Sequence, residues 1–187
     1  MSAIVLHRLG GDNRGSDGKD EEKEWNGEWV VYDKESAVRL RSPECRVVGR
    51  FLGTIPQHPS QNAFLVLPMV ISGEAGRLLI RKGLAVDSSW EKSGRRNERV
   101  GDYDKSFEKL WERGLYITDG AKFGARWMAY EGDPLTYHAM FAVEVVDKPV
   151  PLSQLVSFTR VCHTAKKIPL VTESGDAFVT LDWKNFY

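Results

Sequence analysis

The apolar positions of the first half fall into short runs of strand length, separated by polar turns. Strands are expected at residues 3–9, 29–32, 46–52, 64–70 and 84–86. The run at 64–70 contains Pro68, which lacks a backbone N–H, so we expect this strand to end there. Residues 10–24 are rich in Gly and Asp and predict a flexible loop.

Two helices are expected between these strands. Asp33 is a suitable N-cap for a helix that reaches Arg41, and Ser72 is one for a helix that reaches Lys82. Gly83 then closes the second helix. The apolar residues predicted to form its buried face are Ala75, Leu78 and Leu79.

The second half repeats this mixture of helices and strands after a polar gap. Hydrophobic residues nearly vanish from 87 to 102, which predicts a linker, although Arg95, Arg96 and Arg99 could instead form a phosphate-binding arm. Helices are expected at 105–113 and from Pro151 to about Thr164. Strands are expected at 115–118, 126–130, 139–146, 168–172 and 178–181. The last helix is predicted to bury Leu152, Leu155, Val156 and Val161.

These elements predict an α/β fold of the mixed α+β kind. A small amino-terminal α/β domain is expected over residues 1–86, followed by the linker at 87–102. A second domain over residues 103–187 is expected to hold a mixed sheet flanked by helices.

Composition and charge exclude several classes of function. The 187 residues include 26 Lys and Arg and 26 Asp and Glu, so binding of polyanions by bulk charge is not expected. The longest apolar run, 63–71, is too short for a membrane span, and no secretory signal is expected. Cys45 and Cys162 are far apart, which argues against a disulfide framework or a structural zinc site. We therefore expect a reduced, soluble, intracellular protein.

Three reactive side chains of the second half could act together. Tyr130 ends a strand, His138 follows a Gly-Asp-Pro turn, and Lys167 lies where the last helix passes into a strand. A base, an acid and a cation suit cleavage of RNA, whose 2′-OH is a nucleophile beside each phosphate. Spacing alone leaves the structural alternatives open, because each could equally be an ordinary strand-end, surface or helix-end residue. The neighbours Cys162 and His163 are predicted to serve packing rather than catalysis.

Two sequence blocks resemble a known family. The string Lys122-Phe-Gly-Ala-Arg-Trp-Met-Ala-Tyr-Glu-Gly-Asp-Pro-Leu-Thr-Tyr-His138 closely resembles the catalytic pattern of the tRNA-splicing endonucleases, KFG followed by Y-x-GDP-x-x-x-H. Arg160, seven residues before Lys167, continues the match, whereas Arg126 stands where the family usually has an acidic residue. The block Val-Gly-Arg-Phe-Leu-Gly-Thr-Ile-Pro at 48–56 resembles the amino-terminal domain of the eukaryotic subunit that cuts the 3′ splice site.

The resemblance implies a catalytic subunit that cleaves pre-tRNA at the 3′ exon–intron junction. It implies metal-independent transesterification that leaves 2′,3′-cyclic phosphate and 5′-OH ends, with Tyr130 as general base, His138 as general acid and Lys167 as transition-state stabiliser. Arg160 and Trp183 would bind a splice-site nucleotide through cation–π and stacking contacts. No cofactor or metal is expected. A nuclear heterotetramer is implied, with a second catalytic subunit and two structural subunits.

Charge in the second half agrees with a need for partners. From residue 101 onward, ten Lys and Arg stand against twelve Asp and Glu, a poor balance for an independent tRNA binder. Three alternatives stay open: a structural subunit with an inactive triad, a self-assembling endonuclease of the archaeal type, and a non-enzymatic RNA-binding module. The acid and base roles of Tyr130 and His138 could also be exchanged.

Overall fold

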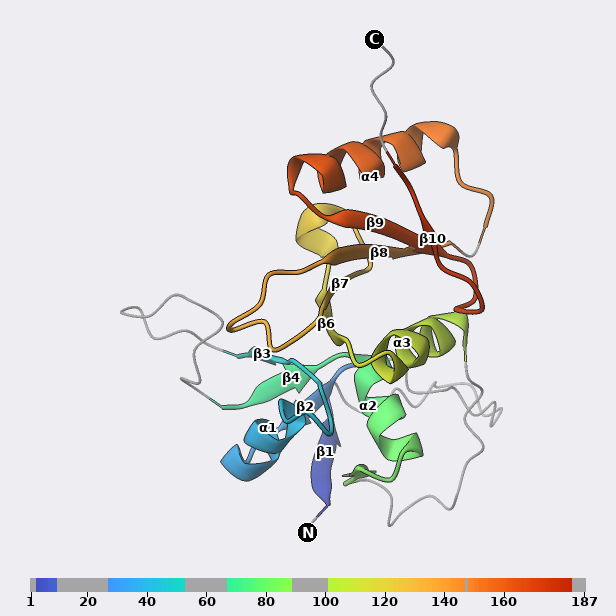
Figure 1. Cartoon of the computed structure of the whole chain (residues 1–187). Helices are drawn as coiled ribbons and strands as arrows, with labels where there is room; N and C mark the ends of the chain where they lie inside the picture. Colours follow the sequence, from blue (N-terminus) through green and yellow to red (C-terminus); the bar gives the residue numbers. More distant parts are fainter. Residues whose placement is uncertain (1–2, 10–26, 53–66, 89–100, 147, 183–187) are drawn as a thin grey trace, which may run out of the picture. The chain divides into compact units, whose positions relative to one another are not determined.

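The computed structural model describes residues 3–9, 27–52, 67–88, 101–146 and 148–182. The chain divides into two units, the first formed by residues 1–45 and 49–100 and the second by residues 46–48 and 101–187. In the described ranges each unit contains a five-stranded mixed sheet and two α-helices (Figure 1). The mixed α/β class expected from the sequence is confirmed.

The first unit is built on a sheet with the strand order β3-β4-β2-β1-β5. Its elements are β1 (Ile4–Arg8), β2 (Trp29–Val31), α1 (Lys34–Leu40), β3 (Arg50–Phe51), β4 (Met69–Ile71), α2 (Gly73–Arg81) and β5 (Ala85–Asp87). Only the β1–β5 pair of this sheet is parallel. Every residue of β2 and β4 is buried, so both faces of these strands are covered.

The two helices of this unit begin at the residues that the sequence predicts. The Asp33 carboxylate accepts a hydrogen bond from the Ser36 backbone N–H at 2.7 Å. The Ser72 hydroxyl accepts one from the Ala75 N–H at 3.2 Å. Gly83 follows α2 with a φ of 71°, the left-handed conformation that favours glycine. The predicted buried face of α2 is confirmed by the burial of Ala75, Leu78 and Leu79.

Pro68 was expected to end a strand, but in the described residues a strand begins directly after it, while residues 64–66 of the expected strand lie outside the described ranges. β4 starts at Met69, and its register pairs Met69 with Val31 of β2 and with Phe51 of β3. The Pro68 carbonyl still accepts a hydrogen bond from the Leu52 N–H at 3.0 Å. The expectation was wrong because a proline that cannot donate can precede a strand as well as end one.

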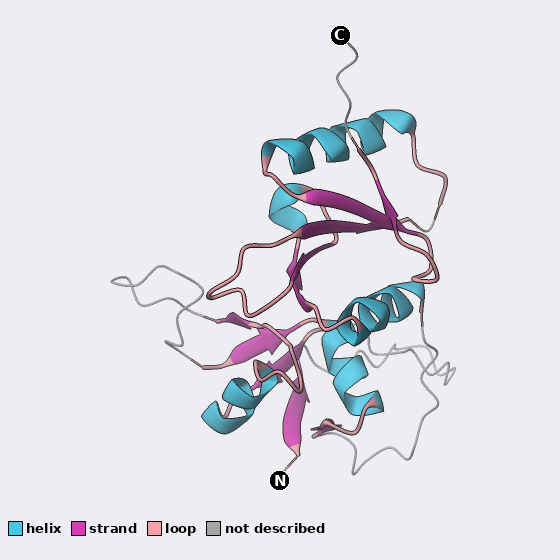
Figure 2. Cartoon of the chain, viewed as in Figure 1, coloured by secondary structure: helices cyan, strands magenta, loops and turns pink. Residues whose placement is uncertain are grey.

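The second unit has the strand order β10-β9-β8-β7-β6. Its elements are α3 (Asp102–Glu112), β6 (Tyr116–Asp119), the short 3₁₀-helix η2 (Ala121–Phe123), β7 (Trp127–Tyr130), β8 (Phe141–Val145), α4 (Leu152–Thr164), β9 (Ile168–Thr172) and β10 (Val179–Thr180). Within this sheet only β8 and β9 are parallel, and α4 is the crossover that connects them (Figure 2).

Helices α3 and α4 cover opposite faces of this sheet. Met128 of β7 packs in one cluster with Phe158 and Cys162 of α4. The preceding residue, Trp127, makes an edge-to-face contact with Phe107 of α3, with ring centroids 5.5 Å apart. Because successive strand residues point to opposite faces, the two helices must lie on different sides.

The predicted buried face of α4 was wrong at two positions. Leu152 is 76% exposed and Val161 is 44% exposed. The buried residues of this helix are Phe158, Thr159 and Cys162. These lie three, four and seven residues after Leu155, on one helical stripe, whereas Leu152 occupies the open first turn and Val161 faces away from the stripe.

Some expectations fall outside the described residues. They concern the loop at 10–24, most of the linker with Arg95, Arg96 and Arg99, and Trp183. Among the helices that are described, none is long and apolar enough to cross a membrane.

Candidate active site

The register of three adjoining strands brings the predicted catalytic residues to one end of the second sheet. Ala129 of β7 pairs with Phe141 of β8, which in turn pairs with Ile168 of β9. Tyr130 follows Ala129 directly, and Lys167 precedes Ile168 directly. Since neighbouring strands lie about 4.8 Å apart, the backbones of Tyr130 and Lys167 are on the order of 10 Å apart. Their long side chains can converge on one phosphate.

Tyr130 is half-buried at the end of β7. Its ring packs against the hydrophobic cluster that contains Met128, Phe158 and Cys162, so it lies on the face that α4 covers. The Thr118 hydroxyl donates a long hydrogen bond of 3.4 Å to the Tyr130 phenolic oxygen. This contact holds the phenol toward β6, and nothing in the sequence had indicated Thr118.

His138 is exposed in the loop that connects β7 to β8. The preceding turn is organised by Asp133, whose Oδ1 accepts a hydrogen bond from the Leu135 N–H at 2.9 Å. The Asp133 carbonyl accepts three more, from the Thr136 N–H at 2.8 Å, the Tyr137 N–H at 3.0 Å and the Thr136 hydroxyl at 3.2 Å. The sequence had predicted a turn here, but not that Asp133 would hold the segment leading to His138.

Lys167 is positioned by the end of α4. The Lys167 N–H donates to the Cys162 carbonyl at 2.8 Å and the Lys166 N–H donates to the His163 carbonyl at 3.1 Å. These two bonds define a Schellman motif, in which the residue between helix and exit adopts a left-handed conformation. Lys166 occupies that position with a φ of 55°. The backbone N–H groups of Lys166 and Lys167 are thus both hydrogen-bonded to α4, and this tight turn places Lys167 immediately before β9.

Arg160 lies on the exposed side of α4, and its carbonyl accepts a hydrogen bond from the Thr164 hydroxyl at 3.0 Å. It precedes Lys167 by two helical turns, near the same end of the helix. Trp183, the other predicted nucleotide-binding residue, lies outside the described residues.

Arg126, the departure from the family pattern, makes aromatic contacts. Its guanidinium lies over the Tyr103 ring of α3, 4.7 Å from the centroid, and 5.7 Å from the centroid of Trp127. Its charge and backbone N–H also lower the pKa of Glu144, but burial has the larger effect and the pKa of this carboxyl is raised overall.

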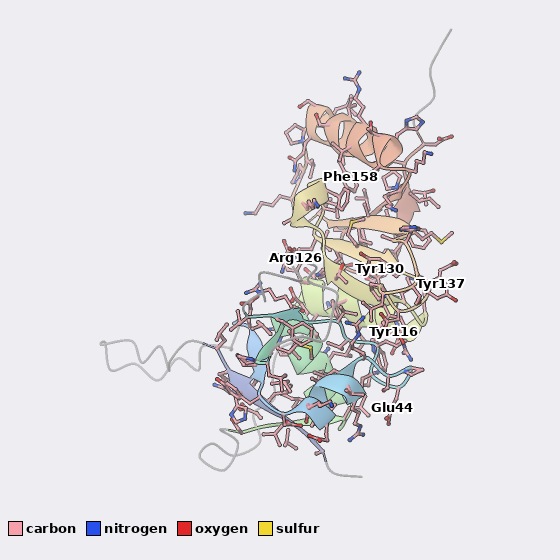
Figure 3. The ribbon with its side chains drawn as sticks, turned by 90° about the vertical axis from the view of Figure 1, so that its left-hand side faces the viewer. Glu44, Tyr116, Arg126, Tyr130, Tyr137 and Phe158 are labelled. Carbon is pink, nitrogen blue, oxygen red and sulfur yellow. The ribbon has the colours of Figure 1, made fainter. Side chains whose placement is uncertain are left out.

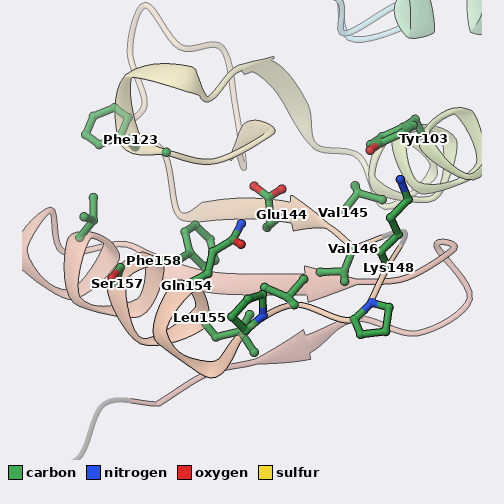
Figure 4. Close-up of a pocket in the computed structure, with 15 residues that line it drawn as sticks. Tyr103, Phe123, Glu144, Val145, Val146, Lys148, Gln154, Leu155, Ser157 and Phe158 are labelled. Carbon is green, nitrogen blue, oxygen red and sulfur yellow. The ribbon is translucent and has the colours of Figure 1, made fainter.

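A cavity of about 510 Å³ lies at the other end of β8 from His138. Glu144 of β8 lines it together with Phe123 of η2 and Phe158 of α4 (Figure 4). The predicted catalytic residues do not line it. The candidate active site therefore lies at the end of β7, in the loop between β7 and β8 and at the start of β9, and not in this cavity.

Cys162 is fully buried and belongs to the cluster beneath α4. Burial raises the pKa of its thiol to about 11, so the thiolate is scarce at neutral pH. Cys162 therefore serves packing, as predicted, whereas the same prediction was wrong for His163, which is exposed on α4. Across the described ranges, no three His, Cys, Asp or Glu side chains gather as a metal site would require.

Comparison with known proteins gives matches in both halves. Residues 22–88 match the family model "TSEN34-like, N-terminal domain", and residues 105–177 match "tRNA intron endonuclease, catalytic C-terminal domain". The tRNA-splicing endonuclease of Hyperthermus butylicus is 30% identical over 158 residues, which cover 78% of this chain and 85% of that protein. The chain therefore belongs to the tRNA-splicing endonuclease family.

Two eukaryotic relatives are similar over different lengths. The tRNA-splicing endonuclease subunit Sen34 of Mus musculus is 36% identical over 83 residues, which cover 41% of this chain but only 26% of the mouse protein. The probable subunit sen34 of Schizosaccharomyces pombe is 22% identical over 250 aligned positions, covering 84% of this chain and 88% of that protein.

Proposed function

We propose that this chain is the subunit of a tRNA-splicing endonuclease that cleaves pre-tRNA at the 3′ exon–intron junction. The observation that carries the proposal is the register Ala129–Phe141–Ile168, which puts Tyr130, the His138 loop and Lys167 at one sheet end. The matches to Sen34 proteins in mouse and fission yeast support the choice of subunit. The presence of all three reactive side chains argues against a purely structural subunit.

The proposed reaction is an internal transesterification. The Tyr130 phenolate removes the proton of the 2′-OH, and the 2′-oxygen attacks the adjacent phosphorus. The bond from phosphorus to the 5′-oxygen breaks, and the His138 imidazolium donates its proton to that leaving oxygen. The products are a 2′,3′-cyclic phosphate and a 5′-OH. Because the nucleophile belongs to the RNA itself, the step needs no activated water.

Lys167 acts on the charge that develops during this reaction. The pentacoordinate phosphorus carries an additional negative charge on its non-bridging oxygens, and a positioned ammonium group stabilises it. The Schellman turn at Lys166 supports this role, since it fixes the backbone from which the Lys167 side chain extends.

RNA binding is proposed to be shared with other subunits. Arg160 and Trp183 would contact a splice-site nucleotide by cation–π and stacking interactions. The excess of acidic residues from position 101 onward makes strong binding by this chain alone unfavourable. A nuclear complex with a second catalytic subunit and two structural subunits would supply the remaining contacts.

The test is cleavage of an intron-containing pre-tRNA by the reconstituted complex in excess EDTA. We expect His138→Ala to slow the 3′-junction cut by at least roughly 100-fold while the 5′-junction cut continues. The native complex should leave 2′,3′-cyclic phosphate ends. His163→Ala is the matched control, because His163 is an exposed histidine on α4.

Each opposite result has a defined meaning. Equal 3′ cutting by the native and His138→Ala complexes would make the chain a scaffold. A native complex that cuts only after Mg²⁺ is added would contradict the metal-independent step. Tight binding of pre-tRNA by the isolated chain, with no cleavage in any assembly, would favour an RNA-binding module.

A further inference from the structure

The loop between β7 and β8 presents an aromatic ring beside His138. Tyr137 is 53% exposed, and Figure 3 shows it at the edge of the second unit. Leu135 and Met140 of the same loop are 43% and 36% exposed. The Met140 N–H donates to the Ala129 carbonyl, and the Met140 carbonyl accepts from the Ile168 N–H, each at 2.9 Å. The loop is thus joined to both strands that carry the proposed catalytic residues.

The Tyr137 ring is held against the backbone of its own loop. A Cβ atom at Gly132 would overlap three carbon atoms of this ring, so the close contact requires glycine. The Tyr137 N–H donates to the Asp133 carbonyl at 3.0 Å, which fixes the backbone as well. A ring packed on one side and open to solvent elsewhere loses little conformational entropy when it binds a second planar group.

We propose that Tyr137 is a stacking surface for the nucleobase on the 3′ side of the scissile phosphate. The inference rests on the proposed function, in which His138 protonates the leaving 5′-oxygen. That oxygen belongs to the nucleotide 3′ of the cleaved bond, so we expect its base to lie near His138 and its exposed neighbour Tyr137. Aromatic side chains stack on any base, because every base has a π-face. Tyr137 therefore binds and positions this nucleotide without reading its identity.

The test follows fluorescence from a pre-tRNA that cannot be cleaved. A 2′-deoxy sugar at the 3′ junction blocks attack, and 2-aminopurine replaces the first base after the junction. We expect the reconstituted native complex to quench this fluorophore by stacking. Tyr137→Phe should keep the quenching, because it keeps the ring, whereas Tyr137→Leu should remove it and weaken binding by roughly tenfold. Tyr32→Leu is the control, since Tyr32 is 58% exposed in the first unit.

Further variants separate this proposal from the cleavage mechanism. Gly132→Ala should displace the ring and reduce the quenching while urea unfolding of the chain stays cooperative. His138→Ala should keep the quenching and lose 3′ cleavage of the ordinary substrate, so failure of the mechanism and failure of the stacking proposal are distinguishable. Unchanged quenching in Tyr137→Leu would overturn the proposal. Weakened subunit assembly in Tyr137→Leu, with normal quenching in each assembled complex, would also overturn it and make the loop a protein contact.

Discussion

Lys166 adopts a left-handed backbone conformation, with a φ of 55°, at the position after α4 where glycine is usual. This conformation costs a residue with a Cβ atom about 1–2 kcal/mol, whereas glycine avoids that cost but loses more conformational freedom on folding. We therefore expect Lys166→Gly to raise the free energy of unfolding by about 0.5 kcal/mol, and Lys166→Val to lower it by about 1 kcal/mol. Urea unfolding of the full chain measures both.

The control is the same change at a residue with right-handed helical backbone. Lys109 is exposed in the last turn of α3, so Lys109→Gly should lower the free energy of unfolding, by up to about 1 kcal/mol. Opposite signs for the two Lys→Gly variants would establish the strain at Lys166. Equal destabilisation by both would contradict it.

The type of a residue predicts local features such as helix caps better than it predicts features that depend on tertiary contacts. Asp33 and Ser72 could be predicted as N-caps because a side-chain oxygen just before a helix can accept a hydrogen bond from a backbone N–H of the first turn. The left-handed conformation of Lys166 could not be predicted, since lysine has no preference for it and the reason is the tertiary path from α4 into β9. The contact of Gly132 with Tyr137 was missed for a similar reason, because a glycine within a turn does not indicate what packs on it.

Glu144 of β8 is half-buried and lines a cavity together with residues of η2 and α4. Burial raises the pKa of this group above the reference value of 4.5, and Arg126 offsets only part of the effect. Glu144 therefore favours the folded state below the pKa of the unfolded chain, and this contribution is lost as the pH rises through the folded-state pKa. We expect Glu144→Gln to raise the free energy of unfolding at pH 7, with a gain that shrinks as the pH falls toward 4.5.

Urea unfolding at a series of pH values between these limits measures this gain. Glu173→Gln, at an exposed position after β9, controls for the loss of one negative charge. A gain for Glu144→Gln that is the same at every pH would show that burial of the charge is not its cause. A gain of equal size in both variants would indicate a general charge effect instead.

A helix or strand is predicted well where its apolar residues and its end signals agree, and poorly where the apolar residues are scattered or an end signal is ambiguous. The helix α2 has a clear stripe, a capping serine and a closing glycine, and all three predictions are confirmed. In α4 the apolar residues are spread around the helix, so the pattern predicts burial of Leu152, but this first helical residue is exposed to solvent. The predicted strand end at Pro68 was wrong because a proline indicates a strand boundary but not whether the strand lies before or after it.

For the whole chain, the candidate site depends on long-range register more than on any local pattern. The sequence resemblance predicts a site at Tyr130, His138 and Lys167. The pairing of β7, β8 and β9 explains how Tyr130 and Lys167, 37 positions apart, come to one end of the sheet. A parallel pair such as β8 and β9 needs a crossover, so α4 both links these strands and delivers Lys167. The candidate site therefore depends on the β8-α4-β9 crossover unit and on the antiparallel pairing of β7 with β8.

The charge of the chain bears on the proposed binding of RNA. Its basic and acidic residues balance at 26 each, so bulk charge does not favour phosphate contacts by the isolated chain. We expect log K for a non-cleavable pre-tRNA to fall with log salt at least roughly twice as steeply for the reconstituted complex as for the isolated chain, because each neutralised phosphate adds about 0.7–0.9 to the slope. Fluorescence anisotropy across a series of KCl concentrations measures both slopes. Equal slopes and affinities would mean that this chain itself supplies the phosphate contacts, and sizing of the isolated chain would then distinguish a monomeric RNA-binding module from a self-assembling endonuclease.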